Sequence, residues 1–280
     1  MVQTERAVWG WAMTGDVGHR VRTGVRTISL DVLAVVAGVV VYFGVRGLTA
    51  GAPETARDHA LDILSVEKTL GLDIEKGVQA LLVNVDVLTT FANWVYIWGH
   101  WPVIAGTLVW LALHDRIIFR RLRNAMLASG ALGLCVYTTY PVAPPRLVGL
   151  GFVDTITDSS NDYRVLQPPA FVNQYAAMPS LHIGWDLLVG LALVAAASTW
   201  LLRFVGRLMP MLMAGATLLT ANHYVLDIVV GAAFGLAGWM IALQLEKRHR
   251  PVVVLPVQRS TTAEPEHRTD PDAPERCAAP

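Results

Sequence analysis

Long apolar stretches dominate the pattern of hydrophobic and polar positions along this chain. A helical window finds them near residues 28–48, 94–113, 124–142, 181–202, 204–221 and 223–245. Each is long enough, or nearly so, to cross roughly 30 Å of hydrocarbon as an α-helix. The pattern therefore predicts an all-α, polytopic membrane bundle of about six transmembrane helices.

Residues 53–92 follow a different pattern, in which apolar and charged positions recur at helical spacing. This spacing favours a pair of amphipathic helices that lie along the outer interface and form a lid or an entrance. A solvated loop packed on the bundle fits the same pattern equally well.

The composition agrees with a membrane protein. Hydrophobic residues make up 54% of the chain, charged residues make up 16%, and the mean hydropathy is +0.45. Because the formal net charge is zero, no overall basic field indicates nucleic acid as a partner. The two cysteines, Cys135 and Cys277, are expected to be free thiols.

Basic residues gather in every second connection between the predicted spans, whereas the other connections are acidic or mixed. The basic set is Arg20, Arg22, Arg26, Arg116, Arg120, Arg121, Arg123, Arg203, Arg207, Lys247, Arg248 and Arg250. By the positive-inside rule, this alternation predicts an inner (plasma) membrane protein with both termini in the cytoplasm. We accordingly expect a cytoplasmic basic segment at 1–26, a membrane-embedded catalytic bundle at 27–246 and a disordered cytoplasmic tail at 247–280.

Three segments carry polar residues that a bare membrane anchor would not need. They are Tyr140-Pro-Val-Ala-Pro-Pro-Arg146, Met178-Pro-Ser-Leu-His182 and Asn222-His-Tyr-Val-Leu-Asp227. The first closes the third span, while the second and third open the fourth and sixth spans. All three therefore map to the extracytoplasmic side, where packing of the bundle is expected to bring them together.

His223 and Asp227 stand four residues apart and share one helix face. A carboxylate in an apolar span needs a partner, and the His223 ring is the nearest candidate. An imidazole held by a carboxylate is the usual arrangement for a nucleophile or general base. The pair is therefore a candidate for chemistry on phosphorus.

His182 follows Ser180, a favoured helix cap, so the first free N–H groups of that helix are expected to attract an anion. A histidine there suits protonation of a departing oxygen. Asp186 lies four residues after His182, so spacing alone does not decide whether His182 or His223 attacks. Arg146 fits a phosphate clamp and a headgroup anchor equally well.

Two other residues have weaker functional readings. His100, between tryptophans, is expected to hydrogen-bond another helix. Ser180 lacks the glycine-flanked turn of an exposed nucleophile, which argues against a serine protease. The alternative function is a proton-coupled transporter whose intramembrane His and Asp residues relay protons, although these residues cluster at one face.

These motifs resemble those of the type 2 phosphatidic acid phosphatase superfamily. Pro179-Ser180-Leu181-His182 matches its P-S-x-H motif, and His223 with Asp227 matches its H-x-x-x-D motif. Pro141-Val-Ala-Pro-Pro145 and Asn222-His-Tyr-Val-Leu-Asp227 look more like the inositol phosphorylceramide synthase branch, an inositolphosphotransferase group. The resemblance covers roughly residues 90–245.

The resemblance implies a membrane enzyme that uses no metal and no cofactor. His223 is then the nucleophile that forms a phosphohistidine, Asp227 its orienting partner, and His182 the acid for the leaving group. The implied substrate is a lipid phosphate or diphosphate among the membrane lipids, attacked at the outer face of the membrane. Water as acceptor gives a phosphatase, and a polyol or sugar gives a phospholipid headgroup phosphotransferase.

The chain departs from the family pattern at the phosphate clamp. Thr139 stands where a lysine is expected seven residues before Arg146, and Leu147 replaces the following proline. Thr217 stands where an arginine is expected six residues before His223. Substitutes are Arg146, Arg164 and the backbone N–H groups of Ser180 and Leu181; Asn222 completes the predicted substrate-binding set.

Overall fold

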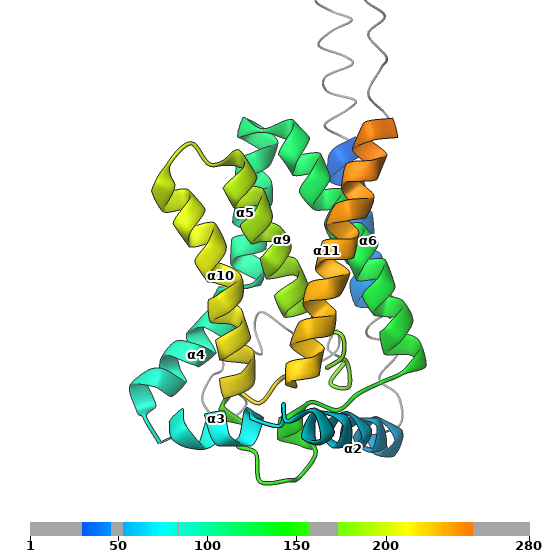
Figure 1. The fold of residues 1–280 in the computed structure, drawn as a ribbon. Coiled ribbons are helices and arrows are strands. Elements are labelled where there is room, and N and C mark those ends of the chain that lie inside the picture. Colours follow the sequence, from blue (N-terminus) through cyan, green and yellow to red (C-terminus); the bar gives the residue numbers. More distant parts are fainter. Residues whose placement is uncertain (1–29, 46–52, 83, 157–172, 249–280) are drawn as a thin grey trace, which may run out of the picture. The chain divides into compact units, whose positions relative to one another are not determined.

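The computed structural model describes residues 30–45, 53–82, 84–156 and 173–248, which are mainly helical (Figure 1). The helices are Leu30–Val45, α2 (Pro53–Leu70), α3 (Glu75–Leu82), α4 (Asp86–Trp98), α5 (Trp101–His114), α6 (Arg116–Thr139), α9 (Leu181–Ala196), α10 (Trp200–Leu219) and α11 (Val225–Arg248), with a 3₁₀ turn at η1 (Pro145–Leu147). The predicted segment 1–26 and nearly all of the predicted tail 247–280 lie outside the described residues.

In the described residues, each of the predicted apolar stretches lies mainly on a helix or on a bent pair of helices, which confirms the helical membrane bundle. By length and hydropathy, α10 and α11 are long and apolar enough to cross a membrane, and the bent pair of α4 and α5 adds a third candidate. The helix Leu30–Val45 and α9 are apolar but shorter. In α6 the first two turns carry the arginine cluster, and the apolar residues follow it.

The predicted span at 94–113 is broken rather than continuous. The axes of α4 and α5 meet at 45°, and Gly99 and His100 lie between the two helices. Pro102 stands in the first turn of α5, where its missing N–H and fixed φ suit the start of a new helix. The break places His100 at the N-cap of α5 and not inside a helix.

The turn between the fourth and fifth spans lies earlier than predicted. α9 ends at Ala196, and Thr199 caps α10 by accepting a hydrogen bond from the Leu202 N–H at 3.4 Å. Arg203 consequently belongs to α10, and its guanidinium donates to the Ala197 carbonyl at 3.1 Å. The start of α10 is therefore determined by the Thr199 cap and not by Arg203 and Arg207.

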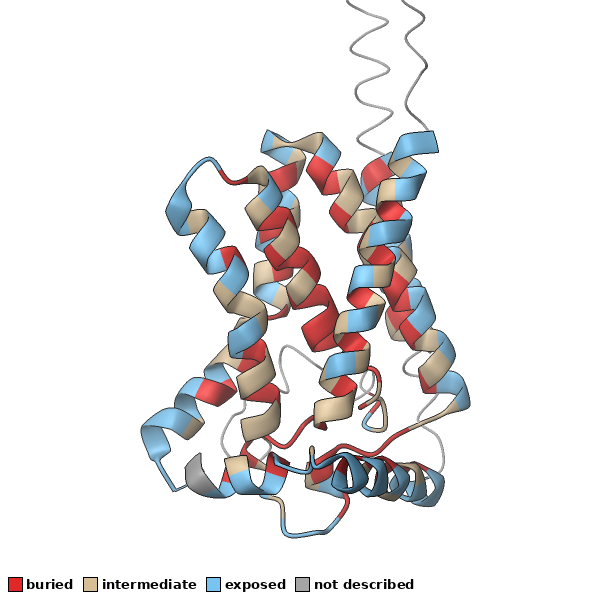
Figure 2. Ribbon diagram, in the orientation of Figure 1, coloured by how far each residue is buried: buried red, intermediate tan, exposed pale blue. Residues whose placement is uncertain are grey.

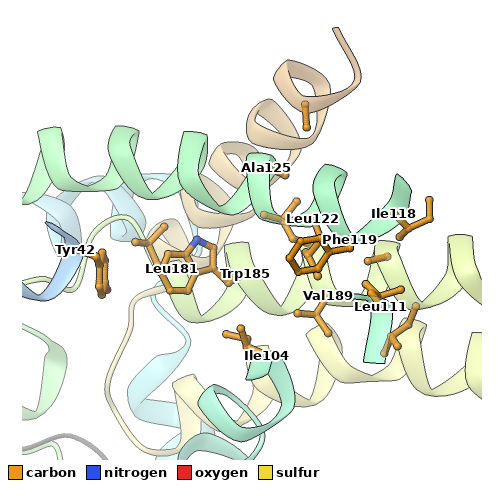
Figure 3. Close-up of a cluster of buried hydrophobic side chains, with 14 of the residues drawn as sticks. Tyr42, Ile104, Leu111, Ile118, Phe119, Leu122, Ala125, Leu181, Trp185 and Val189 are labelled. Atoms are coloured by element: carbon orange, nitrogen blue, oxygen red, sulfur yellow. The ribbon is translucent and has the colours of Figure 1, made fainter. Parts of the chain in front are cut away.

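α9 is the central helix of the bundle and packs against α5, α6, α10 and α11. Its residues are buried along most of its length, including Trp185, Leu188 and Val189 (Figure 2). Trp185 lies in the main apolar cluster with Tyr42 and Leu122, which come from neighbouring helices (Figure 3). Burial of these side chains holds the shorter α9 in place.

Glycines bring the backbone of α11 directly against that of α9. A Cβ on Gly231 would lie 2.1 Å from the carbonyl oxygen of Ser180, and a Cβ on Gly235 would lie 2.7 Å from that of Gly184. Small residues spaced four apart are a common means of close packing between membrane helices. This contact sets the distance between the first turns of α9 and α11.

Ion pairs cluster at the end of the bundle where α6 begins and α11 ends. Asp31 contacts both Arg120 and Arg123, and Arg121 pairs with Glu246 at 2.8 Å. This basic end is opposite the end where α2 and α3 lie (Figure 1). The charges therefore separate along the bundle as the alternation of basic connections predicts.

The amphipathic segment forms the helices α2 and α3, which lie across the ends of α10 and α11 (Figure 1). Ala56, Ala60 and Ile63 of α2 are buried in a second apolar cluster with Val142 and Tyr224. The expectation of helices in this segment is confirmed, and α2 packs on the loops that carry the polar motifs.

The glycine contact makes a testable prediction. Gly231→Ala places a methyl group in overlap with the Ser180 backbone, and overpacking of this kind costs about 1–3 kcal/mol. We expect a melting temperature several degrees lower for the purified protein in detergent. The control is Gly215→Ala on α10, where an added Cβ meets nothing within 4 Å. Equal melting temperatures for Gly231→Ala and wild type would contradict this packing.

Candidate active site

Backbone hydrogen bonds hold the three polar segments together at one end of the bundle. The Val142 N–H donates to the Tyr175 carbonyl at 2.7 Å, and the Arg146 N–H donates to the Ala221 carbonyl at 3.0 Å. The Ser180 N–H donates to the Asp227 carbonyl, also at 3.0 Å. The structure thus brings together the segments that the sequence predicted to converge.

A pocket of about 520 Å³, counted to its open mouth, lies between these segments. Its walls include most of the predicted site residues, namely Arg146, Leu181, His182, Asn222 and His223. Ser180 and Asp227 are fully buried and are not part of this wall.

His182 and His223 face the same pocket. Their ring centroids lie 5.6 Å apart, with the ring planes tilted by 58°. The His182 ring also stacks on Tyr96, at 4.6 Å between centroids. Since a proton donor or nucleophile acts within about 3 Å of its target, two rings at this separation reach a single phosphate group.

The His223 ring is oriented chiefly by a backbone carbonyl. Its Nδ1 lies 2.9 Å from the Ala177 oxygen and 3.4 Å from Asp227 Oδ2. A carbonyl oxygen only accepts, so Nδ1 carries the hydrogen and Nε2 of the neutral ring keeps its lone pair. The tautomer is the one that a nucleophilic Nε2 requires.

Asp227 has a second structural role beside its contact with His223. Its Oδ2 accepts a hydrogen bond from the Tyr224 N–H at 3.0 Å, which caps the start of α11. The other oxygen, Oδ1, is buried without a hydrogen-bond partner among the described residues. The predicted His223–Asp227 pair is present, but the carboxylate shares the orienting role with the Ala177 carbonyl.

Asp186 pairs with His100 and not with His182. The distance from His100 Nδ1 to Asp186 Oδ1 is 2.9 Å, and both residues are buried. The expected hydrogen bond of His100 to another helix is confirmed. The structure also places the His100 ring in the pocket, 4.3 Å from the His182 ring. The signal in the sequence was the Gly99 and Pro102 pair that breaks the helix.

Arg146 is held by two side chains. Its Nε donates to Asn222 Oδ1 and one terminal nitrogen donates to Asp154 Oδ2, both at 2.9 Å. The Asn222 amide nitrogen in turn donates to Thr220 Oγ1 at 2.9 Å. Asn222 therefore positions Arg146 in the pocket wall through its own hydrogen bonds.

Ser180 is the cap of α9. Its hydroxyl oxygen accepts from the Ile183 N–H at 3.4 Å, and its own N–H is bonded to Asp227. The Ser180 N–H is thus not open to substrate, contrary to expectation, because the glycine contact brings α11 against it. Leu181 begins the helix, where N–H groups lack partners within the helix. Arg164 lies outside the described residues.

In the described part of the chain, no group of three or more His, Cys, Asp or Glu side chains is arranged to hold a metal ion.

Two acids of the α2–α3 layer bind the start of α11, directly after His223. Glu67 accepts a hydrogen bond from the Leu226 N–H at 2.7 Å, and Glu75 accepts one from the Val225 N–H at 2.9 Å. Burial raises the pKa of Glu67 to about 8, and the nearby Glu75 adds to the shift. Sequence reasoning missed these acids, since charged positions in an amphipathic segment usually face solvent.

The fold and the pocket define a helical membrane protein with paired histidines at one end of its bundle. The chain belongs to the PAP2 superfamily, whose family model matches residues 61–241. This match covers α3 to α10, parts of α2 and α11, and all three polar segments, while the helix Leu30–Val45 lies outside it. It confirms the resemblance on which the roles of the motifs were predicted.

A curated relative is the phosphoinositol dihydroceramide synthase of Bacteroides thetaiotaomicron. The two sequences are 24% identical over 174 residues, which is 55% of this chain and 55% of the relative. The chain thus spans about half the length of the relative. The similarity supports the inositol phosphorylceramide synthase-like branch. No solved structure matches the chain.

The Glu67 pKa generates a prediction about stability. Folded Glu67 keeps its proton up to about pH 8, whereas the unfolded acid loses it near pH 4.5. The stabilisation of the folded protein by protonated Glu67 is therefore complete below about pH 4.5. It is lost as the pH rises through about 8. We expect the melting temperature to fall by several degrees between about pH 6 and pH 9.

Glu67→Gln keeps a neutral acceptor at this position and should flatten that decline. Glu54→Gln, an exposed acid on the same helix, is the matched control and should keep the wild-type slope. Melting curves in detergent across this pH range make the comparison. An unchanged slope in Glu67→Gln would show that Glu67 does not titrate as described.

Proposed function

We propose that this protein is an integral membrane lipid phosphate phosphatase or phospholipid headgroup phosphotransferase that acts through a phosphohistidine. Membership of the PAP2 superfamily supports phosphatase or phosphotransferase chemistry on a lipid. The observation that carries the mechanism is the pair of rings, His182 and His223, 5.6 Å apart in one pocket.

In the first step His223 Nε2 attacks phosphorus in line with the leaving oxygen. A P–N bond forms as the P–O bond breaks, and the departing oxygen takes a proton from His182. The Nδ1 hydrogen stays on the Ala177 carbonyl and Asp227, which stabilise the positive charge that the ring acquires. Arg146 binds phosphoryl oxygens from the pocket wall.

In the second step His182, now neutral, removes a proton from water or from an acceptor hydroxyl. The oxygen attacks phosphorus, the P–N bond breaks and His223 returns to its neutral form. Water yields free phosphate, or a phosphorylated headgroup if the diester was cleaved. A hydroxyl compound yields a transferred headgroup.

An apolar cavity beside the pocket supports a lipid substrate. It has a volume of about 720 Å³, the open space at its mouth included, and lies between the helix Leu30–Val45, α5, α6 and α9. Tyr42 and Trp101 line both the cavity and the polar pocket. Trp101 Nε1 is buried without a hydrogen-bond partner in the described part of the chain. A lipid whose phosphate lies in the polar pocket would thus have space for its hydrocarbon chain in the apolar cavity. The Trp101 indole N–H would lie near the place where the pocket and the cavity meet.

The similarity to a phosphoinositol dihydroceramide synthase favours a polyol phosphate headgroup as the transferred group. For a transfer of this kind we propose a lipid hydroxyl as the acceptor and a phospholipid with the same headgroup as the donor. A polar acceptor such as inositol or a sugar fits the same two steps.

The protein is also proposed to lie in the plasma membrane with its pocket on the extracytoplasmic side. The basic end of the bundle, where α6 begins with Arg120, Arg121 and Arg123, is opposite the end where α9 and α11 begin (Figure 1), and a basic end favours the cytoplasm. A green fluorescent protein fused after Pro280 should therefore fluoresce in intact cells. A fusion that does not fluoresce, together with an active alkaline phosphatase fused at the same point, would show the opposite orientation.

The mechanism predicts that His223→Ala abolishes both turnover and covalent labelling. The purified protein is offered ³²P-labelled phosphatidic acid, phosphatidylinositol labelled in its phosphate, and a polyprenyl diphosphate. We expect acid-labile label on the wild-type protein and loss of turnover by at least about a thousandfold in His223→Ala, as for removal of other catalytic nucleophiles.

Ser180→Ala removes only the cap and should keep the label, and His114→Ala, an exposed histidine on α5, should match the wild type. Retained labelling in His223→Ala would overturn the mechanism. The amount of free phosphate released is then compared with the amount of headgroup transferred to ceramide, inositol or sugars, and this comparison distinguishes a phosphatase from a transferase.

A further inference from the structure

We propose that His100, held by Asp186, is a phosphate-binding cation of this site and contacts the substrate's phosphoryl oxygens beside Arg146. The inference rests on the proposed function, since it concerns how the same pocket holds a phosphate group.

The geometry aims one nitrogen of His100 away from its partner. Nδ1 lies 2.9 Å from Asp186 Oδ1, and because a carboxylate accepts, Nδ1 is the donor. Nε2, on the opposite side of the ring, has no hydrogen-bond partner among the residues that the structure describes. The ring itself lines the pocket, 4.3 Å from the His182 ring. Nε2 is thus the atom that a ligand in the pocket would meet.

His100 would stand between two negative groups when phosphate is bound, Asp186 on one side and the phosphate on the other. Asp186 is 1% exposed and His100 is 3% exposed, so the carboxylate has little contact with water. A buried carboxylate is costly unless a cation pairs with it. A phosphate anion on the other side of the ring adds a second negative neighbour, and opposite charges within hydrogen-bond distance stabilise an imidazolium. His100 would then donate through both nitrogens.

The pocket needs such a group because its arginine is already engaged. Arg146 donates to Asp154 and to Asn222, so part of its charge is balanced before substrate arrives. The two positions that lack the expected cations, Thr139 and Thr217, bond backbone carbonyls of their own helices. Among the described residues that line the pocket, Arg146 is the permanently charged one. A phosphoryl group has several oxygens and commonly takes more than one charged donor.

A purely structural role is the competing account. In that account the bond between His100 and Asp186 anchors α5 to α9, and Nε2 never meets a ligand. The two accounts differ in whether a neutral ring substitute changes phosphate affinity in a protein that is still folded.

The test is binding of orthophosphate to the purified full chain, measured by equilibrium binding of ³²P-phosphate. His100→Gln keeps a donor toward Asp186 but removes the cation, and we expect the dissociation constant to rise about tenfold or more, the range for a charged hydrogen bond. Asp186→Asn should weaken binding in the same direction, and His100→Lys should recover part of it. His114→Gln should bind as the wild type does.

Wild-type affinity in a folded His100→Gln protein would overturn the proposal. If His100→Gln does not fold, a protection experiment on the wild-type protein tests the proposal instead. Orthophosphate must then slow modification of His100 by diethyl pyrocarbonate, as read by mass spectrometry, and an unchanged rate would overturn it. Phosphate binding requires no turnover, so failure of this inference and failure of the proposed function give different results. Lipid turnover without a His100 effect rejects this inference alone, while His100-dependent phosphate binding without any lipid turnover rejects the proposed function alone.

Discussion

The close contact between α9 and α11 is the constraint on which the site depends. Gly231 and Gly235 leave no side chain between the helices, so the Ser180 N–H reaches the carbonyl of Asp227 at 3.0 Å. That bond fixes the first turn of α9 beside the start of α11. His182 and His223 consequently face one pocket although they lie on separate spans. Larger residues in place of these glycines would move the two imidazole rings apart, although every chemical group of the site would still be present.

Buried charge is the second constraint, and the structure meets it by pairing. The buried carboxylates of α9 and α11 each have an imidazole neighbour, Asp186 with His100 and Asp227 with His223. The start of α11 is held from the other side by Glu67 and Glu75 of the α2–α3 layer. These bonds hold the His223 ring in one orientation and one tautomer, which is the preorganisation that attack on phosphorus requires.

Much of this arrangement could be predicted from the sequence because hydrophobic period and motif spacing are local properties. The helical bundle, the amphipathic helices and the convergence of the three polar segments followed from them, whereas the break between α4 and α5 and the boundary between α9 and α10 did not. The partner of Asp186 could not be predicted, since spacing within α9 offered His182 while the break at Gly99 supplied His100 from another helix. The hydrogen bond of the Ser180 N–H and the contacts of Glu67 and Glu75 with the start of α11 could not be predicted either, because they depend on packing between segments far apart in the sequence.

Vanadate, which adopts the geometry of the transferring phosphoryl group, tests the central claim most directly. A structure of the purified protein with bound orthovanadate should show vanadium joined to Nε2 of His223, with His182 within hydrogen-bond distance of the opposite apical oxygen. Vanadate held elsewhere in the bundle, or reached by one of these histidines and not the other, would contradict a shared phosphate site between α9 and α11.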